Sequence, residues 1–252
     1  MDPLVALCAA GAGYFLGSLS FARLISKLVA PDQDLTTLKV PIVGTDETSK
    51  VNIFGANAAS MILGPRFGCA IGLLDMLKVA LPMQVFKSCY PHQVYFLIVA
   101  VAGLVGHNWP VYHRFKGGRG FSVIFGGFVV VDWLGALVTL VVGMLLGMIV
   151  LQNVSVAYVA WLWLMIPWMW FRTHDFSYLS YAIAVNLIFF IATLPETRMI
   201  IQYRREGKLD GYMQGLMESS PRWRGMQKIA ERFNVFRMRP HKAENQDSNS
   251  LP

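Results

Sequence analysis

Residues that can bind phosphate and move a proton lie together in one segment between two apolar runs. Consecutive glycines let backbone N–H groups turn toward one anion, and a lysine and an arginine beside them add positive charge. Arginine also offers a planar fork that fits phosphate oxygens, and a histidine can move a proton near neutral pH. Residues 110–120 are called the glycine loop below. The candidate residues in and beside it are His107, Lys116, Gly117, Gly118, Arg119 and Gly120. The segment is therefore expected to hold a phosphate at a membrane surface.

A second polar stretch lies earlier in the chain and is rich in hydroxyl, amide and small residues. This first-motif loop, residues 43–60, contains Gly44, Thr45, Gly55 and Asn57. Its composition fits a loop that wraps a small polar ligand. It fits equally a mobile connector in which Asn57 or Ser60 caps a helix, so both interpretations stay open.

Two ionisable residues lie inside an apolar run. Asp75 and Lys78 are three positions apart, so they share one face of a helix. A charge inside a membrane span is costly unless it is paired or faces a polar cavity. The pair is therefore either structural or directed at a substrate.

The composition places all of these residues in an integral membrane protein. The chain has 252 residues, of which 55% are hydrophobic and 15% charged, and its mean hydropathy is +0.46. Long apolar runs predict an all-α membrane protein with about seven transmembrane helices. The fourth run is short for a span of roughly 17 to 25 residues, so it either borrows the preceding loop or stops partway. The expected spans are 4–29, 67–87, 94–109, 121–131, 133–151, 154–171 and 176–194.

Basic residues set the expected orientation. No positive charge precedes the first span, whereas Arg23 and Lys27 close it. Basic residues favour the cytoplasmic side, so the N-terminus is expected outside and the glycine loop in the cytoplasm. Asp132 then forms a turn between two outer helix ends. The C-terminus is expected in the cytoplasm, because residues 198–247 hold 11 Lys and Arg against 6 Asp and Glu.

The chain divides into a transmembrane part, residues 1–210, and a cytoplasmic tail, residues 211–252. From Pro221 onward, apolar residues at helical spacing lie opposite a basic stripe, which is typical of a helix on an anionic membrane. Residues 240–252 are polar and are expected to be disordered.

The order of short motifs resembles the bacterial acyl-phosphate:glycerol-3-phosphate acyltransferase family. The resemblance covers roughly residues 10 to 210, and the glycine loop is its specific part. The matching motifs are Gly17-Ser18, Ser26-Lys27, Val43-Gly44-Thr45, Gly55-Ala56-Asn57, Leu63-Gly64, Leu74-Asp75-Met76-Leu77-Lys78, Gly106-His107 and Phe115-Lys116-Gly117-Gly118-Arg119-Gly120.

The resemblance implies a multi-pass enzyme of the bacterial inner membrane, with residues 1–210 as its acyltransferase domain. Such an enzyme moves a fatty acyl group from an acyl-phosphate to the 1-hydroxyl of glycerol 3-phosphate and gives lysophosphatidate for phospholipid biosynthesis. The implied partners are these two substrates and membrane lipid. No nucleic acid, metal or cofactor is implied, and the oligomeric state is left open.

The resemblance also assigns roles to residues. His107 acts on the attacking hydroxyl or fixes the loop, and the sequence does not choose between the two. The catalytic candidates are His107, Thr45 and Lys116. The candidates for binding substrate phosphate are Lys116, Gly117, Gly118, Arg119, Gly120, Gly44, Gly55, Asn57, Lys78 and Asp75.

Two departures from the family pattern keep other functions open. An acidic insertion separates Gly44-Thr45 from Gly55, and Ala58 stands where an asparagine is usual. The histidine and asparagine expected after the last span are missing from residues 195–207. The chain is therefore an ordinary member, an acyltransferase with another acceptor, or an inactive relative. A small membrane transporter or assembly subunit is the alternative from a different class, although the chain shows no convincing internal repeat.

Overall fold

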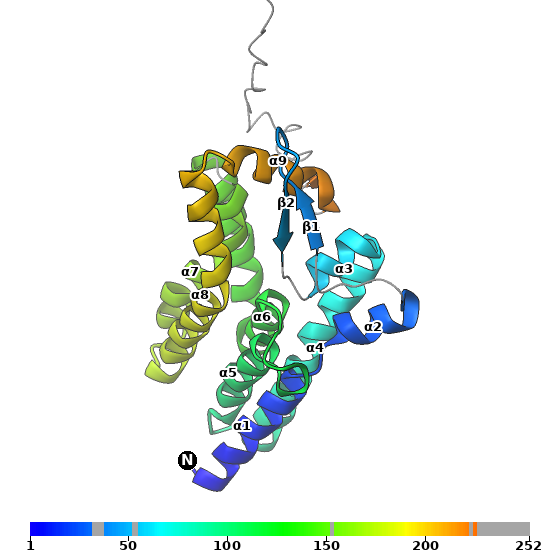
Figure 1. The fold of residues 1–252 in the computed structure, drawn as a ribbon. Helices are drawn as coiled ribbons and strands as arrows, with labels where there is room; N and C mark the ends of the chain where they lie inside the picture. The colour runs from blue at the N-terminus through cyan, green and yellow to red at the C-terminus, as the bar shows by residue number, and fades with distance from the viewer. Residues whose placement is uncertain (32–37, 52–54, 152–153, 222–223, 226–252) are drawn as a thin grey trace, which may run out of the picture.

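The structure, a computed structural model, describes residues 1–31, 38–51, 55–151, 154–221 and 224–225. This part of the chain is mostly helical but also contains a two-stranded antiparallel sheet, which the predicted all-α fold did not include. The long helices pack side by side, and the sheet lies at one end of them with the last helix (Figure 1). In chain order the elements are α1 (Pro3–Gly17), α2 (Phe21–Val29), β1 (Leu38–Pro41), β2 (Thr48–Val51), α3 (Ala56–Ile62), α4 (Pro65–Cys89), α5 (Tyr95–Asn108), the 3-10 turn Val111–His113, α6 (Phe121–Leu145), the π-helical turn Leu146–Val150, α7 (Val154–Thr173), α8 (Phe176–Arg205) and α9 (Leu209–Ser219).

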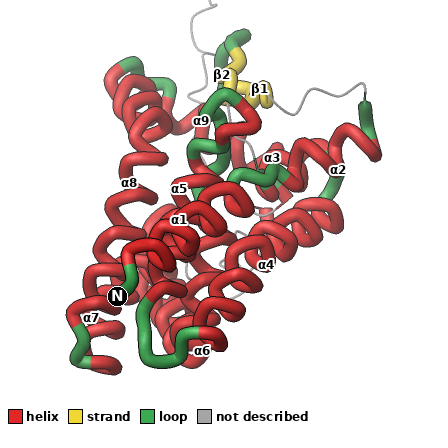
Figure 2. The backbone as a smooth tube through the Cα atoms, turned by 90° about the horizontal axis from the view of Figure 1, so that it is seen from below, coloured by secondary structure: helices red, strands yellow, loops and turns green. Residues whose placement is uncertain are grey.

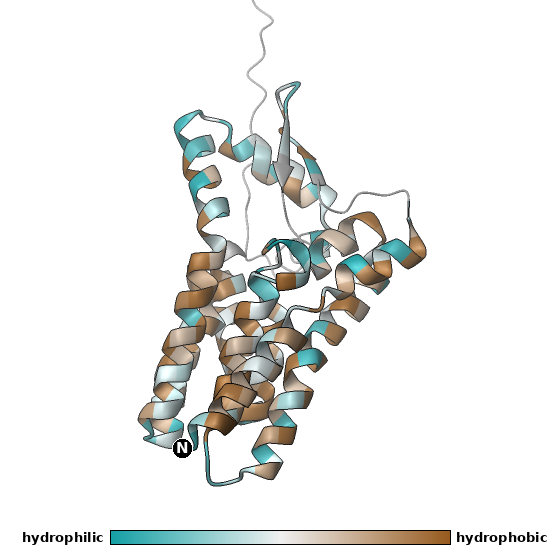
Figure 3. Cartoon of the chain, turned by 60° about the horizontal axis from the view of Figure 1, so that its bottom comes forward, coloured by the Kyte–Doolittle hydropathy of each residue, from teal (hydrophilic) through white to brown (hydrophobic). Residues whose placement is uncertain are grey.

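The protein is a multi-pass membrane protein. Apolar residues dominate the long helices, whereas polar residues gather at the hairpin turn, on part of α9 and on the adjoining end of α8 (Figure 3). Within the described residues, five helical segments are long and apolar enough to cross a membrane: Pro3–Val29, Pro65–Cys89, Tyr95–His113, Phe121–Val150 and Phe176–Arg205.

The structure divides the first predicted span, 4–29, into two helices. α1 ends at Gly17, where the Ser18 hydroxyl donates to the Tyr14 carbonyl at 2.8 Å. The chain then turns, and α2 runs outward from the helices (Figures 1 and 2). Arg23 and Lys27 lie on α2 together with exposed leucines. α2 is therefore an amphipathic helix, which suits the surface of a membrane rather than its interior.

Glycines bring α1 and α5 into backbone contact. A Cβ atom at Gly13 would collide with the Val99 carbonyl, and one at Gly17 would collide with the Gly103 carbonyl. Small residues allow this approach, which stabilises helix pairs in lipid by close van der Waals packing. The contact fixes the end of α1 against the end of α5, which leads directly into the glycine loop.

Asp132 interrupts α6. Its backbone is non-helical, with φ −151° and ψ 96°. One carboxylate oxygen accepts from the Gly135 N–H at 3.0 Å, as an N-cap does, and the other accepts from the Trp168 indole N–H at 2.9 Å. Arg172 lies 3.4 Å from the same carboxylate. Asp132 therefore ends one helix, starts the next and attaches both to α7.

The chain reverses direction at Asp132. Phe121, which begins the first half of α6, stacks on Tyr158 with ring centroids 4.1 Å apart. Gly147, just after the second half, packs directly against Ala157. Both ends of the segment thus lie beside the start of α7, whereas the turn contacts Trp168 near the end of α7. The two halves are antiparallel and correspond to the spans predicted on either side of this turn.

The sheet and α9 form a cap at one end of the helices. The cap comprises the hairpin β1–β2 and α9, and its core contains Val40, Ile42 and Tyr212. The Val43 N–H donates to the Gly211 carbonyl at 3.1 Å, which joins the two parts. The predicted boundary at 210/211 falls inside α9, so the first residues of the predicted tail belong to the folded cap. Of the helix predicted from Pro221, the structure describes only residues 221, 224 and 225, which are helical; its remainder and the disorder predicted for 240–252 lie outside the described residues.

We predict that Asp132→Ala destabilises the protein by about 2 to 4 kcal/mol, because it removes an N-cap and leaves the Trp168 indole without its acceptor. Thermal unfolding in detergent measures the change. Asp175→Ala is the matched control: Asp175 also caps a helix, through the Ser177 N–H at 2.7 Å, but it is exposed and contacts no indole. It should cost only about 1 kcal/mol. Equal losses in the two variants would contradict the role given to Asp132.

Candidate active site

The glycine loop folds back onto the end of α5. The Gly118 N–H donates to the His107 carbonyl at 3.1 Å, and Gly117 lies so close to that carbonyl that a side chain would collide with it. Arg114 and Phe115 adopt left-handed backbone conformations, with φ of 52° and 58°. The loop is therefore tightly wound, and the Gly118 N–H, one of those expected to bind phosphate, is used inside it.

Other backbone N–H groups of the loop remain available. Those of Gly117, Arg119 and Gly120 make no hydrogen bond to another described residue. The Lys116 side chain is exposed at the loop surface. The structure thus keeps together backbone donors and positive charge, the combination that binds phosphate.

The end of α1 and the start of α2 bind backbone carbonyls in and beside the loop. Arg23 on α2 donates from its guanidinium to the Lys116 carbonyl at 2.7 Å. The Tyr14 hydroxyl on α1 donates to the Trp109 carbonyl at 3.1 Å. In the sequence, Arg23 indicates only a charge that sets orientation, and its position after the first apolar run is the one sign of a further role.

Asp75, Lys78 and His107 meet beneath the loop. The Lys78 ammonium lies 2.8 Å from Asp75 Oδ1, 2.9 Å from His107 Nδ1 and 2.6 Å from the Leu19 carbonyl, to which it donates. The side chains of Asp75 and Lys78 are only 4% and 2% exposed. An ammonium has three donors, and three acceptors surround this one. Of the two roles left open for the Asp75–Lys78 pair, the geometry favours the structural one.

These contacts also fix the state of His107. A charged Lys78 has only donors, so His107 Nδ1 must accept, and a neutral ring then carries its proton on Nε2. Nδ1 is therefore not free to act as a base. The geometry favours a His107 that orients the loop and offers an Nε2–H donor over one that removes a proton.

α8 holds the side chain of Arg119. Its Nε and Nη2 atoms lie 2.9 Å and 2.8 Å from Glu196 Oε1 on α8. Both side chains are about one quarter exposed, at 24% and 26%. Arg119 keeps further N–H groups for a phosphate, but Glu196 fixes its position. In the sequence, Glu196 is only part of an altered motif, because no local pattern links residues this far apart.

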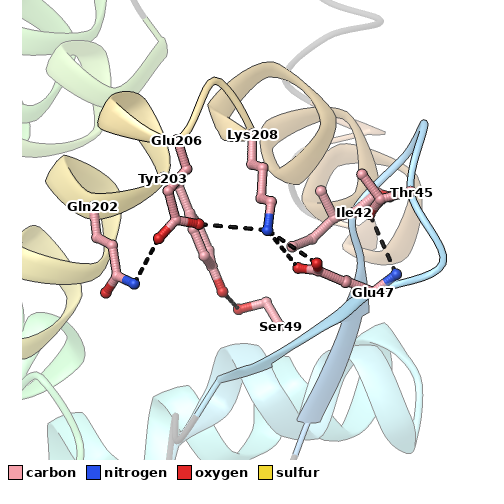
Figure 4. A network of polar contacts seen from close by, with 8 residues as sticks. All are labelled: Ile42, Thr45, Glu47, Ser49, Gln202, Tyr203, Glu206 and Lys208. Atoms are coloured by element: carbon pink, nitrogen blue, oxygen red, sulfur yellow. Dashed lines mark hydrogen bonds and ion pairs between the residues drawn. The ribbon is translucent and has the colours of Figure 1, made fainter.

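The structure places Gly44 and Thr45 in the hairpin turn of the cap. The Thr45 hydroxyl donates to the Ile42 carbonyl at 3.0 Å and accepts from the Glu47 N–H at 3.3 Å. Gly44 has φ of 88°. Thr45 is thus used within its own turn, which points away from the long helices, and no described contact joins it to the glycine loop (Figures 1 and 4).

Gly55 and Asn57 lie at the start of α3. Gly55 is the N-cap residue, so Asn57 does not cap this helix. The Asn57 side chain instead contacts the Ser220 hydroxyl, with 3.5 Å between the oxygens. The end of α9 therefore meets the first-motif loop.

Polar contacts join the hairpin to the start of α9 and to the end of α8. Glu47 of the hairpin contacts the Lys208 ammonium at 2.8 Å, and Ser49 accepts from the Tyr203 hydroxyl at 3.0 Å (Figure 4). The hydrogen bond that the Lys208 ammonium donates to the Glu47 carboxylate raises the pKa of Lys208. Burial, followed by the nearby charge of Glu196, raises the pKa of Tyr212 well above its usual value, so this phenol stays neutral.

Comparisons with known proteins identify relatives of this protein. The family model described as "Glycerol-3-phosphate acyltransferase" matches residues 7–207. Glycerol-3-phosphate acyltransferase 1 of Lactobacillus johnsonii is 28% identical over 207 residues, which cover 82% of this chain and 87% of the relative. The glycerol-3-phosphate acyltransferase of Mycoplasma capricolum is 30% identical over 151 residues, but this match spans only 58% of this chain and 53% of the relative.

Two solved structures share the fold. Both are of PlsY, described as an integral membrane glycerol 3-phosphate acyltransferase. Its lysophosphatidic acid form has a TM-score of 0.62 at 21% identity and covers 79% of this chain and 93% of its own. Its glycerol 3-phosphate form has a TM-score of 0.63 at 24% identity and covers 81% of this chain and 93% of its own.

The buried ion pair yields a stability prediction. Asp75→Leu and Lys78→Met should each destabilise the protein by about 3 to 5 kcal/mol, because each leaves an uncompensated buried charge. The double variant should lose much less than the sum of the two. Unfolding in detergent measures all three.

Lys208→Met serves as the control, because it breaks an exposed pair with Glu47 and should barely change the melting temperature. Additive losses at Asp75 and Lys78 would show that the two side chains do not act as a pair.

Proposed function

We infer that this chain, which belongs to the glycerol-3-phosphate acyltransferase family, transfers a fatty acyl group from an acyl-phosphate to the 1-hydroxyl of glycerol 3-phosphate. In this reaction the hydroxyl oxygen bonds to the acyl carbon and loses its proton, while the bond from that carbon to the phosphate oxygen breaks. The products are lysophosphatidate, a precursor of phospholipids, and phosphate. The acyl chain needs lipid and both substrates carry phosphate, so the reaction belongs where membrane meets water.

The single observation that carries the proposal is the way the glycine loop is held. Arg23, His107 and Glu196 fix it from three helices, and Lys116 and Arg119 place positive charge on it. An acyl-phosphate is already activated, so a site that positions both substrates and stabilises developing negative charge supplies most of the catalysis. The charged residues and backbone N–H groups of this loop suit both tasks.

Within this proposal, each part of the loop has a role. Lys116, Arg119 and the available N–H groups of Gly117 and Gly120 bind phosphate oxygens. His107 orients the loop through its carbonyl and offers its Nε2–H to a substrate oxygen. Lys78 and Asp75 act indirectly by holding His107. Gly55 and Asn57, beside the cap, remain candidates for the acceptor side of the site.

The proposed membrane arrangement has seven crossings. They are α1, α4, α5, the two halves of α6, α7 and α8, and the reversal at Asp132 supports counting α6 twice. Arg23 belongs to α2, Arg66 to the start of α4 and Lys116 to the loop before α6, and α2 and α3 lie toward the end of the bundle that carries the cap (Figure 1). Because basic residues favour the cytoplasmic side, we place this end in the cytoplasm of a bacterial cell, with the N-terminus outside. Residues 1–210 then form the acyltransferase domain, and α9 contributes to its cap.

Single-cysteine labelling tests this arrangement. In a background without Cys8, Cys69 and Cys89, cysteines at His92 and Trp133 should react with a membrane-impermeant reagent in intact cells. Cysteines at Lys116 and Glu218 should react only after permeabilisation. A cysteine at Trp133 that behaves like the one at Lys116 would contradict the reversal at Asp132.

Kinetics of Arg119 variants test the proposed site. Arg119→Ala should lower kcat/KM about tenfold to a hundredfold, because it removes a charge-assisted contact worth about 1.5 to 3 kcal/mol. Arg119→Lys should fall between alanine and wild type, since it keeps the charge and loses the planar fork. Arg205→Ala, an exposed arginine at the end of α8, is the control and should leave kcat/KM unchanged.

Glu196→Gln separates two explanations of such a loss. It breaks the pair with Arg119 but leaves the guanidinium in the site. A phosphate-binding Arg119 should therefore keep most activity in Glu196→Gln. Equal losses in Glu196→Gln and Arg119→Ala would mean that Arg119 only holds α8. Wild-type kinetics in Arg119→Ala would mean that the phosphate site lies elsewhere.

A further inference from the structure

Asn108, the last residue of α5, is a buried polar side chain without a partner. The residue is 4% exposed, and neither its Oδ1 nor its Nδ2 atom makes a hydrogen bond to a described residue. Leaving a buried amide unpaired costs free energy, and such groups in folded proteins usually meet water or a ligand. Neither the sequence motifs nor the site described above gives this side chain a task.

The Asn108 amide lies at the start of α6. A Cβ atom placed on Gly120, the N-cap residue, would be 2.9 Å from Asn108 Oδ1. Gly120 has φ of 78°, and no side chain caps the helix. The first turn of a helix presents N–H groups without helical partners and carries partial positive charge, so it attracts anions. The Asn108 carboxamide therefore lies beside the start of this helix, and a half-turn of the amide about χ2 exchanges Oδ1 and Nδ2 at that position.

The surrounding residues favour an anion rather than an apolar group. The glycine loop brings Lys116 and Arg119 to the same helix start, because Gly120 is its last residue. Among the described asparagines, the half-buried Asn186 shows what a purely structural amide looks like. Its Nδ2 donates to the Leu162 and Ala182 carbonyls, each at 2.9 Å. Asn108 lacks such partners, although its side chain is more deeply buried than that of Asn186.

We propose that the Asn108 amide and the first turn of α6 together bind an oxygen of a substrate phosphate. Nδ2 donates to that oxygen from the inner side of the glycine loop, while the cations approach from its surface. The identity of the substrate rests on the proposed function: the phosphate belongs to the acyl-phosphate or to glycerol 3-phosphate. Asn108 is then a residue that selects phosphate and sets its depth in the site.

Steady-state kinetics with each substrate varied in turn test the proposal. Asn108→Ala should raise the KM of one phosphate-bearing substrate about tenfold to a hundredfold with a smaller change in kcat. Asn108→Asp has the same shape but places a negative charge beside the phosphate, so its KM should rise further. The substrate whose KM changes identifies the phosphate. Asn186→Ala is the matched control and should lower the melting temperature while leaving both KM values unchanged.

A binding measurement keeps the proposal testable apart from the acyl transfer reaction. Inorganic phosphate should raise the melting temperature of the wild-type protein in detergent, by a mass-action effect that grows with its concentration. The rise should shrink in Asn108→Ala and vanish in Asn108→Asp. If the wild type transfers no acyl group but phosphate still protects it through Asn108, the proposed function fails and the phosphate site stands.

Other outcomes would overturn the site. Wild-type KM values and an undiminished phosphate effect in both Asn108 variants would show that the amide holds only water. The same conclusion follows if Asn108→Leu is more stable than wild type and keeps both KM values. If Asn108→Asp fails to fold, Asn108→Ala and Asn108→Leu decide the question.

Discussion

The buried ammonium of Lys78 is the interaction on which the site depends. A charge inside a membrane protein persists only where surrounding groups replace the water it has lost. Here Asp75 of α4, the Leu19 carbonyl after α1 and His107 of α5 surround it. These groups come from three separate segments, so satisfying one charge also fixes their relative positions. The glycine loop starts just after α5, so the same contacts hold its first residues in place.

Two different kinds of packing meet at this site. Toward the membrane interior, glycines let α1 and α5 approach until their backbones touch, and the core is apolar. Toward water, the cap has a small core that Met199 and Tyr203 of α8 also contact, and the exposed Glu47–Lys208 pair joins its hairpin to the start of α9. Exposed pairs contribute little to stability, whereas a buried pair is strongly destabilising when broken. Apolar packing therefore holds the cap on α8, and the buried Asp75–Lys78 pair holds the helices beneath the glycine loop.

The sequence predicted what depends on local pattern. Hydropathy located most helices, the spacing of Asp75 and Lys78 placed them on one face, and Asp132 was recognised as a turn between helices. The rest depends on contacts that no local pattern encodes. The pair of Arg119 and Glu196 joins residues 77 positions apart, and the two strands are only four residues each. Hydropathy also passed over the break after Gly17, because the residues on both sides are apolar. Asn108 was missed because its significance lies in burial without a partner.

The most direct test of the central claim is the identity of the product lipid. Purified protein would receive an acyl-phosphate together with glycerol 3-phosphate and several other phosphorylated polyols, and mass spectrometry with positional analysis would identify what is formed. The account predicts that the acyl group appears on the 1-hydroxyl of glycerol 3-phosphate, as lysophosphatidate. Acylation of another polyol in preference, or release of free fatty acid without any acylated acceptor, would contradict it.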